Sequence, residues 1–461
     1  MSTMNAEAVI CGAGIAGVSA AYHLTVKEGL RDVILVDERA PLTLTSDKST
    51  EAYRNWWPGP GNTMVRFMNR SIDLLEVLAH ESDNYFNMNR RGYVFFTARP
   101  EQASVMRRVA EEISALGAGP IRTYLGRPGD PAYPPCQPRG FDPGLEGAEL
   151  VLSPGEVRKR YPFIKEAALA MLHVRRCGWL SAQQLGMYLL QEAKGAGAKY
   201  LMGRVSGVGV AEEGIKSVQV IGEKGPFEIS TGTLVIAAGP LLKQTGAMIG
   251  LDLPVFNELH GKIAFNDPQG VIPRDVPLMI WTDPMTLPWT EEERDVLRES
   301  EKTGWLLEEF PSGVHFRPEG GEGSDTILAL WTYDIKPQEP VWPPVFDPEY
   351  GEIVLRGMAG MVPGLSMYLG RSAKPFVDGG YYCKTRENRP LIGPLPVGGA
   401  FVIGALSGFG IMASMAAGEL LAKHVAGSHL PDYAPAFLLS RYEDPSYKEM
   451  LANWDPTSGQ L

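Results

Sequence analysis

The chain is poor in cysteine, and this scarcity excludes several classes of protein. Its 461 residues hold 4 cysteines, Cys11, Cys136, Cys177 and Cys383, and no two of them form a CxxC pair. We therefore expect neither a disulfide framework nor a structural zinc site, and no metal site is predicted. Widely spaced cysteines are typical of a reducing compartment, so we expect a cytoplasmic protein.

Positive charge is also in short supply. The chain has 43 Lys and Arg against 54 Asp and Glu, a net charge of −11, and no basic block, so nucleic acid is not an expected partner. The first residues lack a basic segment followed by an apolar one, so no signal peptide is expected. Residues 397–417 carry no charge, but their glycines predict a buried strand, turn and helix rather than a membrane span.

The N-terminal segment carries the first positive signal. EAVIC at 7–11 reads as a short strand, GAGIAG at 12–17 as a glycine-rich turn that opens a helix, and VILV at 33–36 as a second strand. Gly12 would allow the tight turn, Gly14 the approach of a pyrophosphate, and Gly17 the close packing of the helix on the strand. Asp37 ends the second strand and can bind ribose hydroxyls. The unit predicts dinucleotide binding; a purely structural glycine turn is the alternative.

Two later segments extend this pattern. LVIAAGP at 234–240 reads as a strand whose small residues, Ala238 and Gly239, would let a second backbone pass close to the same cofactor. GAFVIGALSGFGIMASMAAGELLA at 399–422 reads as a strand, a Gly-Phe-Gly turn and a helix that closes over a flavin ring. One cofactor held by both ends of the chain indicates a flavoenzyme. Further helices are predicted at 63–80, 153–162, 181–196, 290–302 and about 412–426; the charged 290–302 segment should be a solvated helix.

Together with TSDKSTEAYR at 45–54, RRGYVFFT at 90–97, GWLSAQQLGMYLLQEAKGAGA at 178–198 and TRENRPLIGPLP at 385–396, the chain resembles the D-amino-acid-oxidase superfamily of FAD-dependent oxidoreductases. It is most similar to the glycine oxidase, sarcosine oxidase and dimethylglycine dehydrogenase branch, over roughly 7–100, 150–262 and 370–425. The resemblance implies an α/β plus α+β protein, with a Rossmann-like FAD-binding domain interleaved with a substrate domain on a mainly antiparallel sheet. The expected FAD-binding parts are 1–90, 151–254 and 371–430, the substrate parts 91–150 and 255–370, and a C-terminal extension 431–461.

The resemblance also implies a set of cofactor-binding residues. Asp37 and Glu38 would lie at the adenosine ribose, and Val205 would meet adenine through its backbone. The pyrophosphate and the ring would be lined by Ser46, Lys48, Ser49 and Thr50. Backbone N–H groups near Gly408 would stabilise negative charge on the reduced flavin. The whole predicted set is Gly12, Ala13, Gly14, Ile15, Ala16, Gly17, Asp37, Glu38, Arg39, Ser46, Lys48, Ser49, Thr50, Val205, Ala238, Gly239, Arg389, Gly408, Phe409, Gly410, Ile411 and Met412.

Departures from the family concern the flavin linkage. Sarcosine oxidases attach FAD through a cysteine whose position here falls on Gly380, three residues before Cys383. The dimethylglycine dehydrogenase type uses a histidine in the first loop, and residues 40–62 contain none. We expect noncovalent FAD, with flavinylation at Cys383 as the alternative.

Other departures concern the substrate. The oxidases clamp a carboxylate between an arginine, matched here by Arg54, and a lysine, replaced here by Met412. Either Arg317 or Lys262 completes the clamp, or the substrate is not an amino acid. The oxygen-activating lysine is absent from the expected strand 327–334, which favours a dehydrogenase; the electron acceptor is O2 or another redox carrier.

The predicted reaction is oxidation of a C–N bond in a secondary or tertiary amine or N-methyl amino acid, by hydride transfer to flavin N5, giving an imine that hydrolyses. Arg54, His260 and Tyr382 are the catalytic candidates; Tyr381 is a further possible base, and His260 and Tyr382 have structural roles as their alternatives. Trp56 and Trp57 would either shape an aromatic pocket for a cation or cap the core. The competing functions are a 2-hydroxy acid dehydrogenase or oxidase and a non-catalytic flavoprotein assembly factor.

Overall fold

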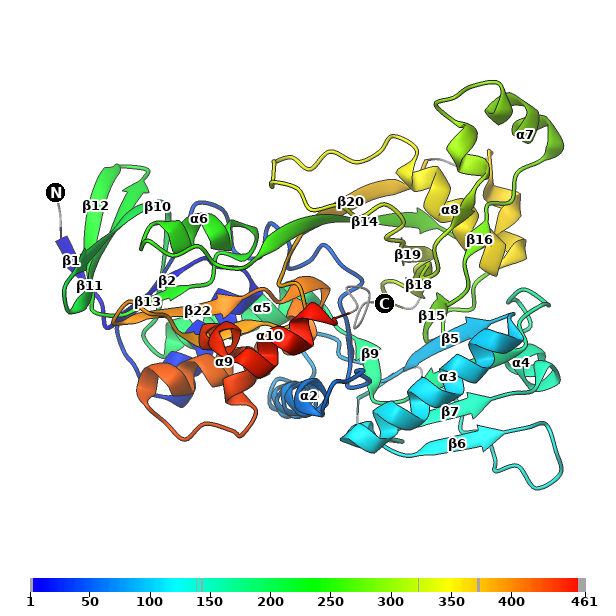
Figure 1. Ribbon diagram of the computed structural model, residues 1–461, viewed down its shortest axis with the longest axis horizontal. Helices are drawn as coiled ribbons and strands as arrows, with labels where there is room; N and C mark the ends of the chain where they lie inside the picture. The colour runs from blue at the N-terminus through cyan, green and yellow to red at the C-terminus, as the bar shows by residue number, and fades with distance from the viewer. Residues whose placement is uncertain (1–2, 138, 142–143, 322, 371–373, 455–461) are drawn as a thin grey trace.

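Two nine-stranded sheets organise the chain, and they lie side by side along its longest axis (Figure 1). The computed structural model describes residues 3–137, 139–141, 144–321, 323–370 and 374–454. The predicted α/β plus α+β class is confirmed, because one sheet has a parallel centre with helices against it and the other is mainly antiparallel.

The first sheet is built around four short apolar strands that pair in parallel. Its strands are β1 (Thr3–Asn5), β2 (Ala8–Cys11), β3 (Val33–Asp37), β10 (Lys199–Ala211), β11 (Gly214–Gly222), β12 (Gly225–Ser230), β13 (Leu234–Ile236), β21 (Leu391–Pro394) and β22 (Ala400–Gly404). Their order is β1-β12-β11-β10-β3-β2-β13-β22-β21, so the N-terminal β2 lies beside β13, and β13 beside the C-terminal β22. Near-continuous burial of these central strands explains their apolar sequences.

Helices from distant parts of the chain pack on one another beside this sheet. They are α1 (Ile15–Tyr22), α2 (Thr63–Glu81), α5 (Ala182–Gly195) and α9 (Gly410–Ala426). Helix α1 contacts both α5 and α9, and the Ser19 hydroxyl donates to the Ser414 carbonyl at 2.7 Å. The glycine-rich segment near the N-terminus and the segment 399–422 therefore lie side by side, as expected for one cofactor bound by both.

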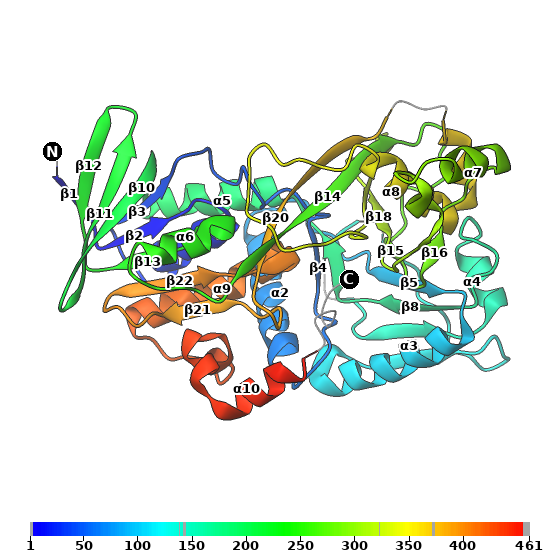
Figure 2. The same ribbon diagram turned by 45° about the horizontal axis from the view of Figure 1, so that its top comes forward.

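The second sheet has the order β20-β14-β19-β18-β15-β5-β8-β7-β6. Its strands are β5 (Tyr93–Thr97), β6 (Ile121–Tyr124), β7 (Ala148–Val151), β8 (Ala170–Val174), β14 (Phe256–Asn266), β15 (Leu278–Trp281), β18 (His315–Pro318), β19 (Thr326–Leu330) and β20 (Phe376–Lys384). The long strands β14 and β20 reach from this sheet towards the first one (Figure 2). Two short strands that are distant in the chain, β4 (Ala52–Arg54) and β9 (Cys177–Trp179), pair antiparallel between the two sheets (Figures 1 and 2).

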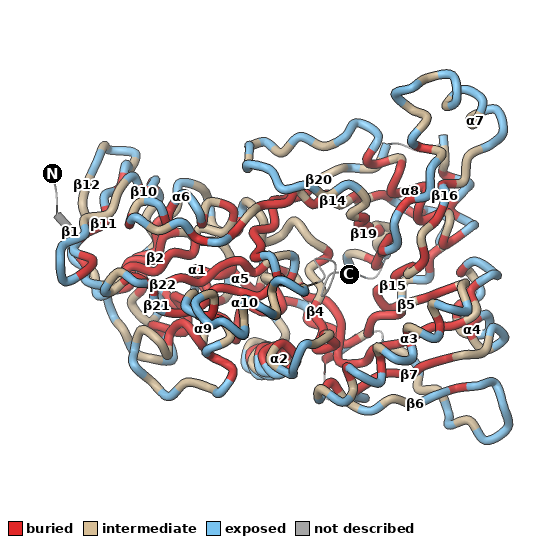
Figure 3. The backbone as a smooth tube through the Cα atoms, viewed as in Figure 1, coloured by how far each residue is buried: buried red, intermediate tan, exposed pale blue. Residues whose placement is uncertain are grey.

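Burial is concentrated in the central strands of both sheets and in the segments between them (Figure 3). The helices predicted at 63–80, 153–162 and 181–196 are present as α2, α4 (Pro154–Arg160) and α5. Helix α7 (Glu291–Arg298) is shorter than predicted and has no buried residue, which fits a solvated helix. Four α-helices of the described residues were not predicted, α3 (Pro100–Ile113), α6 (Leu242–Ala247), α8 (Tyr350–Met361) and α10 (Pro445–Ala452), and the strand expected at 327–334 ends at Leu330.

The uncharged run 397–417 forms β22, a short turn and the start of α9. Among the described residues, no helix is both long and apolar enough to cross a membrane. The domain boundaries stay a prediction; residues 455–461 of the expected C-terminal extension lie outside the described residues, and β20, assigned above to an FAD-binding part, pairs with β14 of the second sheet.

Candidate active site

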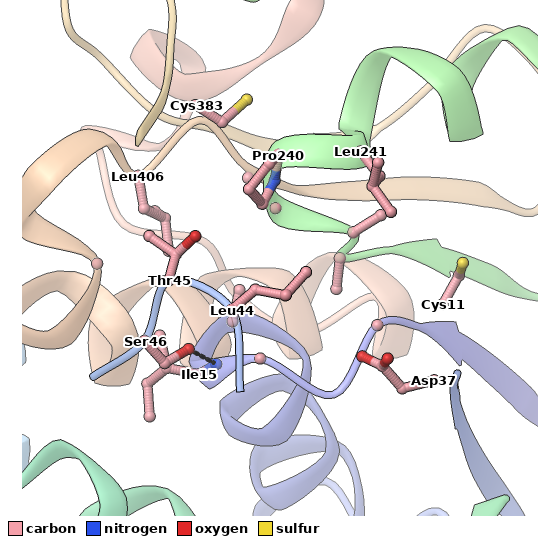
Figure 4. A pocket seen from close by; sticks show the side chains of 18 of the residues that line it. Cys11, Ile15, Asp37, Leu44, Thr45, Ser46, Pro240, Leu241, Cys383 and Leu406 are labelled. Atoms are coloured by element: carbon pink, nitrogen blue, oxygen red, sulfur yellow. Dashed lines mark hydrogen bonds between the residues drawn. The ribbon is translucent and has the colours of Figure 1, made fainter. Parts of the chain in front are cut away.

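A cavity of ≈ 260 Å³ opens where the parallel strands of the first sheet end and the helices α1 and α9 begin. Figure 4 shows the β2–α1 turn, the 44–46 loop and the segments around Pro240, Cys383 and Leu406 converging on it. Five stretches distant in sequence therefore form one binding space. Carboxyl ends of parallel strands are the usual ligand-binding edge of such a sheet.

The glycine-rich turn is shaped as the motif predicts. Gly12 has φ +114°, and a Cβ there would collide with the Ala237 backbone. A Cβ on Gly17 would collide with the Gly12 carbonyl, so Gly17 serves close helix packing rather than the lining. Helix α1 has no side-chain cap at Gly14. Its N-terminal N–H groups consequently point at the cavity with their partial positive charge.

Asp37 fixes this turn from the end of β3. Its carboxylate accepts the Ala13 amide at 2.7 Å and the Arg39 amide at 3.0 Å. Burial raises the pKa of Asp37, and the two amide bonds oppose that shift. Each carboxylate oxygen keeps a lone pair for a ligand hydroxyl. The neighbouring Glu38 is more exposed and lies 3.7 Å from the Arg39 guanidinium.

Most predicted cofactor residues line the cavity. They are Gly12, Gly14, Ile15, Ala16, Asp37, Glu38, Arg39, Ser46, Ser49, Val205, Ala238, Gly239, Gly408, Gly410 and Ile411, together with the catalytic candidate Tyr382. Ser46 accepts the Ile15 amide at 3.0 Å, the bond drawn in Figure 4, and so ties the first loop to the start of α1. Leu44 and Thr45 also line the cavity and were not predicted; they adjoin Ser46 in the same loop.

Seven predicted cofactor residues do not line the cavity. Ala13 and Gly17 shape the turn, while Met412 is buried in the core and Phe409 packs on Trp57. Arg389 points elsewhere, donating to the Pro60 carbonyl at 3.0 Å. Lys48 and Thr50 instead attach the first loop to the second sheet, through Asp378 and Arg317 respectively.

The first loop is pinned to the second sheet by three basic residues. Lys48 pairs with Asp378 at 2.9 Å, and Lys262 donates to the Asp47 carbonyl at 2.6 Å. Arg317 donates to the Thr50 carbonyl at 2.5 Å and pairs with Glu319. Lys262 and Arg317 already bind the first loop and Glu319. Neither is therefore free to bind a substrate carboxylate together with Arg54.

His260 and Tyr382 stack on each other, with ring centroids 4.1 Å apart. The Nε2 atom of His260 lies 3.1 Å from Glu258, and the same Glu258 oxygen accepts from Lys384 at 2.9 Å. Burial lowers the pKa of His260, and the Glu258 hydrogen bond only partly offsets this. The imidazole is therefore neutral near pH 7, next to a ring that lines the cavity.

Arg54 is 6% exposed and forms no ion pair within the part of the chain that the structure describes. Its guanidinium lies over the Trp57 ring at 4.9 Å, and Trp57 in turn meets Phe409 edge-on at 4.9 Å. These contacts place Arg54 beside the segment whose Gly408 and Gly410 line the cavity. Its Nε atom is buried with no hydrogen-bond acceptor.

Two further groups near Arg54 were missed by the sequence reasoning. Tyr93 is fully buried, its hydroxyl has no hydrogen-bond partner, and it interacts electrostatically with Arg54. Burial and, to a smaller degree, the nearby Arg54 charge together lower the pKa of His315 to about 4. RRGYVFFT contained Tyr93, but no sequence signal distinguished it from a core tyrosine.

Cys383 and Cys11 are the two cysteines that line the cavity. Burial raises the pKa of each thiol to about 12. Both are therefore protonated near neutral pH and are poor nucleophiles, because the thiolate is the reactive form. Gly380, at the family's flavin-linking position, carries no side chain and abuts the first loop. These observations favour noncovalent binding.

The residues present fit an FAD molecule. The N-terminal turns of α1 and α9, whose N-cap residues Gly14 and Phe409 supply no side-chain cap, suit a pyrophosphate and an anionic flavin edge, and Asp37 suits a ribose. The Tyr381 hydroxyl is buried without a partner, the Arg39 Nε atom makes no hydrogen bond, and both residues line the cavity. Such unused donors are rare in folded proteins unless a ligand satisfies them.

Comparison with known proteins agrees with this geometry. Residues 7–424 match the family described as FAD dependent oxidoreductase. Mitochondrial dimethylglycine dehydrogenase of Rattus norvegicus is 25% identical over 329 residues, covering 71% of this chain and 32% of the relative. The human protein of the same name is 25% identical over 55% of this chain and 26% of its own length. The chain thus spans about a third or less of the curated relatives it matches.

Solved structures share the fold over nearly the whole chain. L-proline dehydrogenase from P. horikoshii superposes with TM-score 0.71 at 20% identity, covering 96% of this chain and 99% of that one. Glycine oxidase from Geobacillus kaustophilus gives TM-score 0.71 at 18% identity, covering 95% and 99%. The FAD-bound L-alpha-glycerophosphate oxidase from Mycoplasma pneumoniae gives 0.64 at 12% identity, covering 94% and 98%. With a family match that spans most of its length and a cavity built for the cofactor, the chain belongs to the family of FAD-dependent oxidoreductases.

Proposed function

We propose that this protein oxidises the carbon–nitrogen bond of an amino acid whose nitrogen is secondary or tertiary, such as an N-methyl amino acid. The observation that carries the proposal is the pair Arg54 and Tyr93. Both are buried, they interact electrostatically, and each has a donor without an acceptor. A buried cation without a counter-charge is costly, so a substrate carboxylate is the natural partner.

FAD, when bound, accepts two electrons and a hydrogen from the carbon next to the substrate nitrogen. Arg54 and Tyr93 hold the carboxylate and so fix which C–H bond faces the cavity. Trp57 and Phe409 form an apolar wall beside Arg54 and keep water away from it. The imine product then takes up water and separates into an amine and a carbonyl compound.

His260 is the proposed proton acceptor. An ammonium nitrogen has no lone pair to assist loss of hydride, so the substrate must first become a neutral amine. His260 is neutral because burial lowers its pKa. Burial raises the pKa of Glu258, but the His260 hydrogen bond and the Lys384 charge outweigh it, so Glu258 stays ionised and orients the imidazole. Tyr382 positions His260 by stacking and remains protonated, since burial raises its pKa.

The names of the relatives support an amino-acid substrate. Three of them are named for dimethylglycine, glycine and L-proline, and two of these compounds carry a secondary or tertiary nitrogen. The runner-up function is oxidation of a 2-hydroxy acid, which Arg54 would anchor in the same way. A non-catalytic assembly role would leave the unused donors of Arg54 and Tyr93 unexplained.

The test is anaerobic bleaching of the purified flavoprotein with matched donors. The panel pairs an N-methyl amino acid with the 2-hydroxy acid of the same carbon skeleton and with the same amine lacking the carboxylate. The proposal predicts that the first compound bleaches the flavin far faster than the other two, with methylamine and a 2-oxo acid, or formaldehyde and the demethylated amino acid, as products. Bleaching by the hydroxy acid alone would support the runner-up, and no bleaching by any donor would support the assembly role.

A further inference from the structure

A proline-rich segment joins β19 to α8 across the gap between the two sheets. We call residues 332–349 the strap; it contains Pro337, Pro340, Pro343, Pro344 and Pro348. In Figures 1 and 2 it is the yellow connection that runs beside β14 and β20. Proline restricts backbone freedom, so such a segment holds its course at little entropic cost. No cofactor motif includes any part of it.

The strap is anchored along β14 and β20. The Gln338 amide donates to the Asn257 carbonyl at 2.9 Å. Further along, aromatic rings fill the space above two glycines: a Cβ on Gly379 would lie 2.8 Å from Phe346, and one on Gly261 would lie 2.6 Å from Tyr350. The Tyr350 hydroxyl also donates to the Gly261 carbonyl. A side chain at Gly379 would collide with both Phe346 of the strap and the His260 carbonyl of β14, and one at Gly261 would collide with Tyr350 at the start of α8.

Trp342 lies between the two sheets at the end of this row of rings. Its indole meets Tyr381 of β20 with centroids 5.7 Å apart and planes at 73°. On its other side, the Arg39 guanidinium lies 5.3 Å from the indole centre. Arg39 follows β3 of the first sheet, whereas Tyr381 belongs to the second, and both line the cavity. Trp342 therefore connects the two walls of the cavity.

The two neighbours of Trp342 carry donors of different kinds. The Tyr381 hydroxyl is buried without a hydrogen-bond partner, whereas the Arg39 Nε atom makes no hydrogen bond but lies 3.7 Å from the Glu38 carboxylate. Tyr381 is 1% exposed, so water does not satisfy its hydroxyl from the surface. The ring of Trp342 limits the orientations open to each side chain. Two cavity-lining donors beside one indole indicate a place where an oxygen-rich part of a ligand is bound.

We propose that Trp342, which is not itself a lining residue, supports the FAD-binding site: it packs on Arg39 and Tyr381 and holds the donors of both towards the ribose and phosphate oxygens of the cofactor. The strap is then a retaining element for a cofactor that is not covalently attached. This proposal concerns affinity for FAD and is independent of which substrate the enzyme oxidises.

The experiment measures FAD binding to the apoprotein, not turnover. The dissociation constant and the dissociation rate of FAD are followed by flavin fluorescence for the wild type, Trp342→Ala, Trp342→Leu and Tyr381→Phe. We expect Trp342→Ala to raise the dissociation constant of FAD about tenfold, mainly through faster FAD release. The substitution removes the packing on Arg39 and Tyr381 but leaves the glycine-rich turn intact. Trp342→Leu, which keeps bulk without the aromatic face, should give a smaller rise.

Trp305→Ala is the matched control, since Trp305 is a half-exposed tryptophan that packs on Phe310 and Tyr333 away from the lining residues. It should leave FAD affinity unchanged. Combining Trp342→Ala with Tyr381→Phe should raise the dissociation constant by less than the product of the single effects, because the two residues act on the same ligand atoms. A dissociation constant within twofold of wild type for both Trp342 variants, or an equal rise in Trp305→Ala, would overturn the proposal.

Discussion

The imidazole of His260 lies against the ring of Tyr382 with centroids 4.1 Å apart and planes at 20°. Tyr382 is also held from the other side, since a Cβ on Gly408 would lie 2.7 Å from its ring. The stack therefore joins β14 and β20 of one sheet to the loop before α9 of the other. It links a buried neutral base to the wall of the cofactor cavity, and this link makes His260 testable.

We predict that His260→Gln lowers kcat/KM by about 10²- to 10⁴-fold, the usual contribution of a positioned base. In the wild type, kcat/KM should fall as the pH drops through the pKa of His260, which burial places below its ordinary 6.5. The variant should lose this acidic limb, because glutamine does not titrate. His424→Gln is the control, as His424 lies in the last turn of α9. An acidic limb that persists unchanged in His260→Gln would exclude His260 as the base.

Arg54→Met should raise KM for an amino-acid substrate about 10- to 100-fold, the range expected for loss of a hydrogen-bonded charge pair. The same change should raise the melting temperature of the substrate-free protein. Arg54 is a buried cation without a counter-charge, and an apolar side chain removes the cost of burying it. Steady-state kinetics and thermal unfolding measure the two effects.

Arg317→Met is the contrasting control. Arg317 is 1% exposed but paired with Glu319 and bonded to the Thr50 carbonyl. Its removal leaves the buried Thr50 carbonyl without a partner and should destabilise the protein by about 1 to 3 kcal/mol. If Arg54→Met is destabilising to the same degree, Arg54 has a structural partner and the carboxylate anchor must be sought elsewhere.

The flavin linkage gives a third prediction. Acid precipitation should release the yellow colour into the supernatant, because burial raises the pKa of the Cys383 and Cys11 thiols to about 12 and leaves no thiolate to attack the ring. Cys383→Ser should retain FAD as the wild type does. A yellow pellet from the wild type that becomes colourless in Cys383→Ser would establish flavinylation at Cys383.

Acid stability gives a fourth prediction. Burial lowers the pKa of His23 from 6.5 to about 4, so the folded protein holds it neutral. The unfolded chain binds a proton below about pH 6.5 while the folded one does not, so this histidine removes on the order of 3 kcal/mol of stability as the pH falls from 6.5 to 4. His23→Asn, which keeps a donor for the Ser19 carbonyl, should lose this dependence. The free energy of unfolding in urea is measured at about pH 7 and about pH 4.5 for both proteins. An equal loss of stability between the two pH values in the wild type and in His23→Asn would contradict the prediction.

Sequence reasoning located the cofactor because its signals are local. The GAGIAG motif needs only a strand before it and a helix after it. Asp37 and Ser46 follow it within the same N-terminal segment of the chain. The same reasoning assigned Lys48 and Thr50 to the lining, where the structure uses them to dock the loop on Asp378 and Arg317. Residue type indicated a polar contact but not its partner.

The substrate side could not be derived in this way. Tyr93 and His315 approach Arg54 because β5 and β18 lie in one sheet, separated only by β15. No short sequence motif encodes that strand order. Trp342 is harder still, since its neighbours Arg39 and Tyr381 are far from it in the chain and belong to different sheets. Long-range packing decides these contacts.

The most direct test of the account compares two substrates in two proteins. Anaerobic rates of flavin reduction are measured for the wild type and Arg54→Met, each with an N-methyl amino acid and with the matching amine that lacks the carboxylate. The quantity compared is the rate constant of flavin reduction divided by the dissociation constant of the substrate. We predict that in the wild type this ratio is at least about tenfold higher for the amino acid than for the amine, and that Arg54→Met abolishes the difference. An undiminished preference in Arg54→Met would contradict the carboxylate anchor on which the proposed function rests.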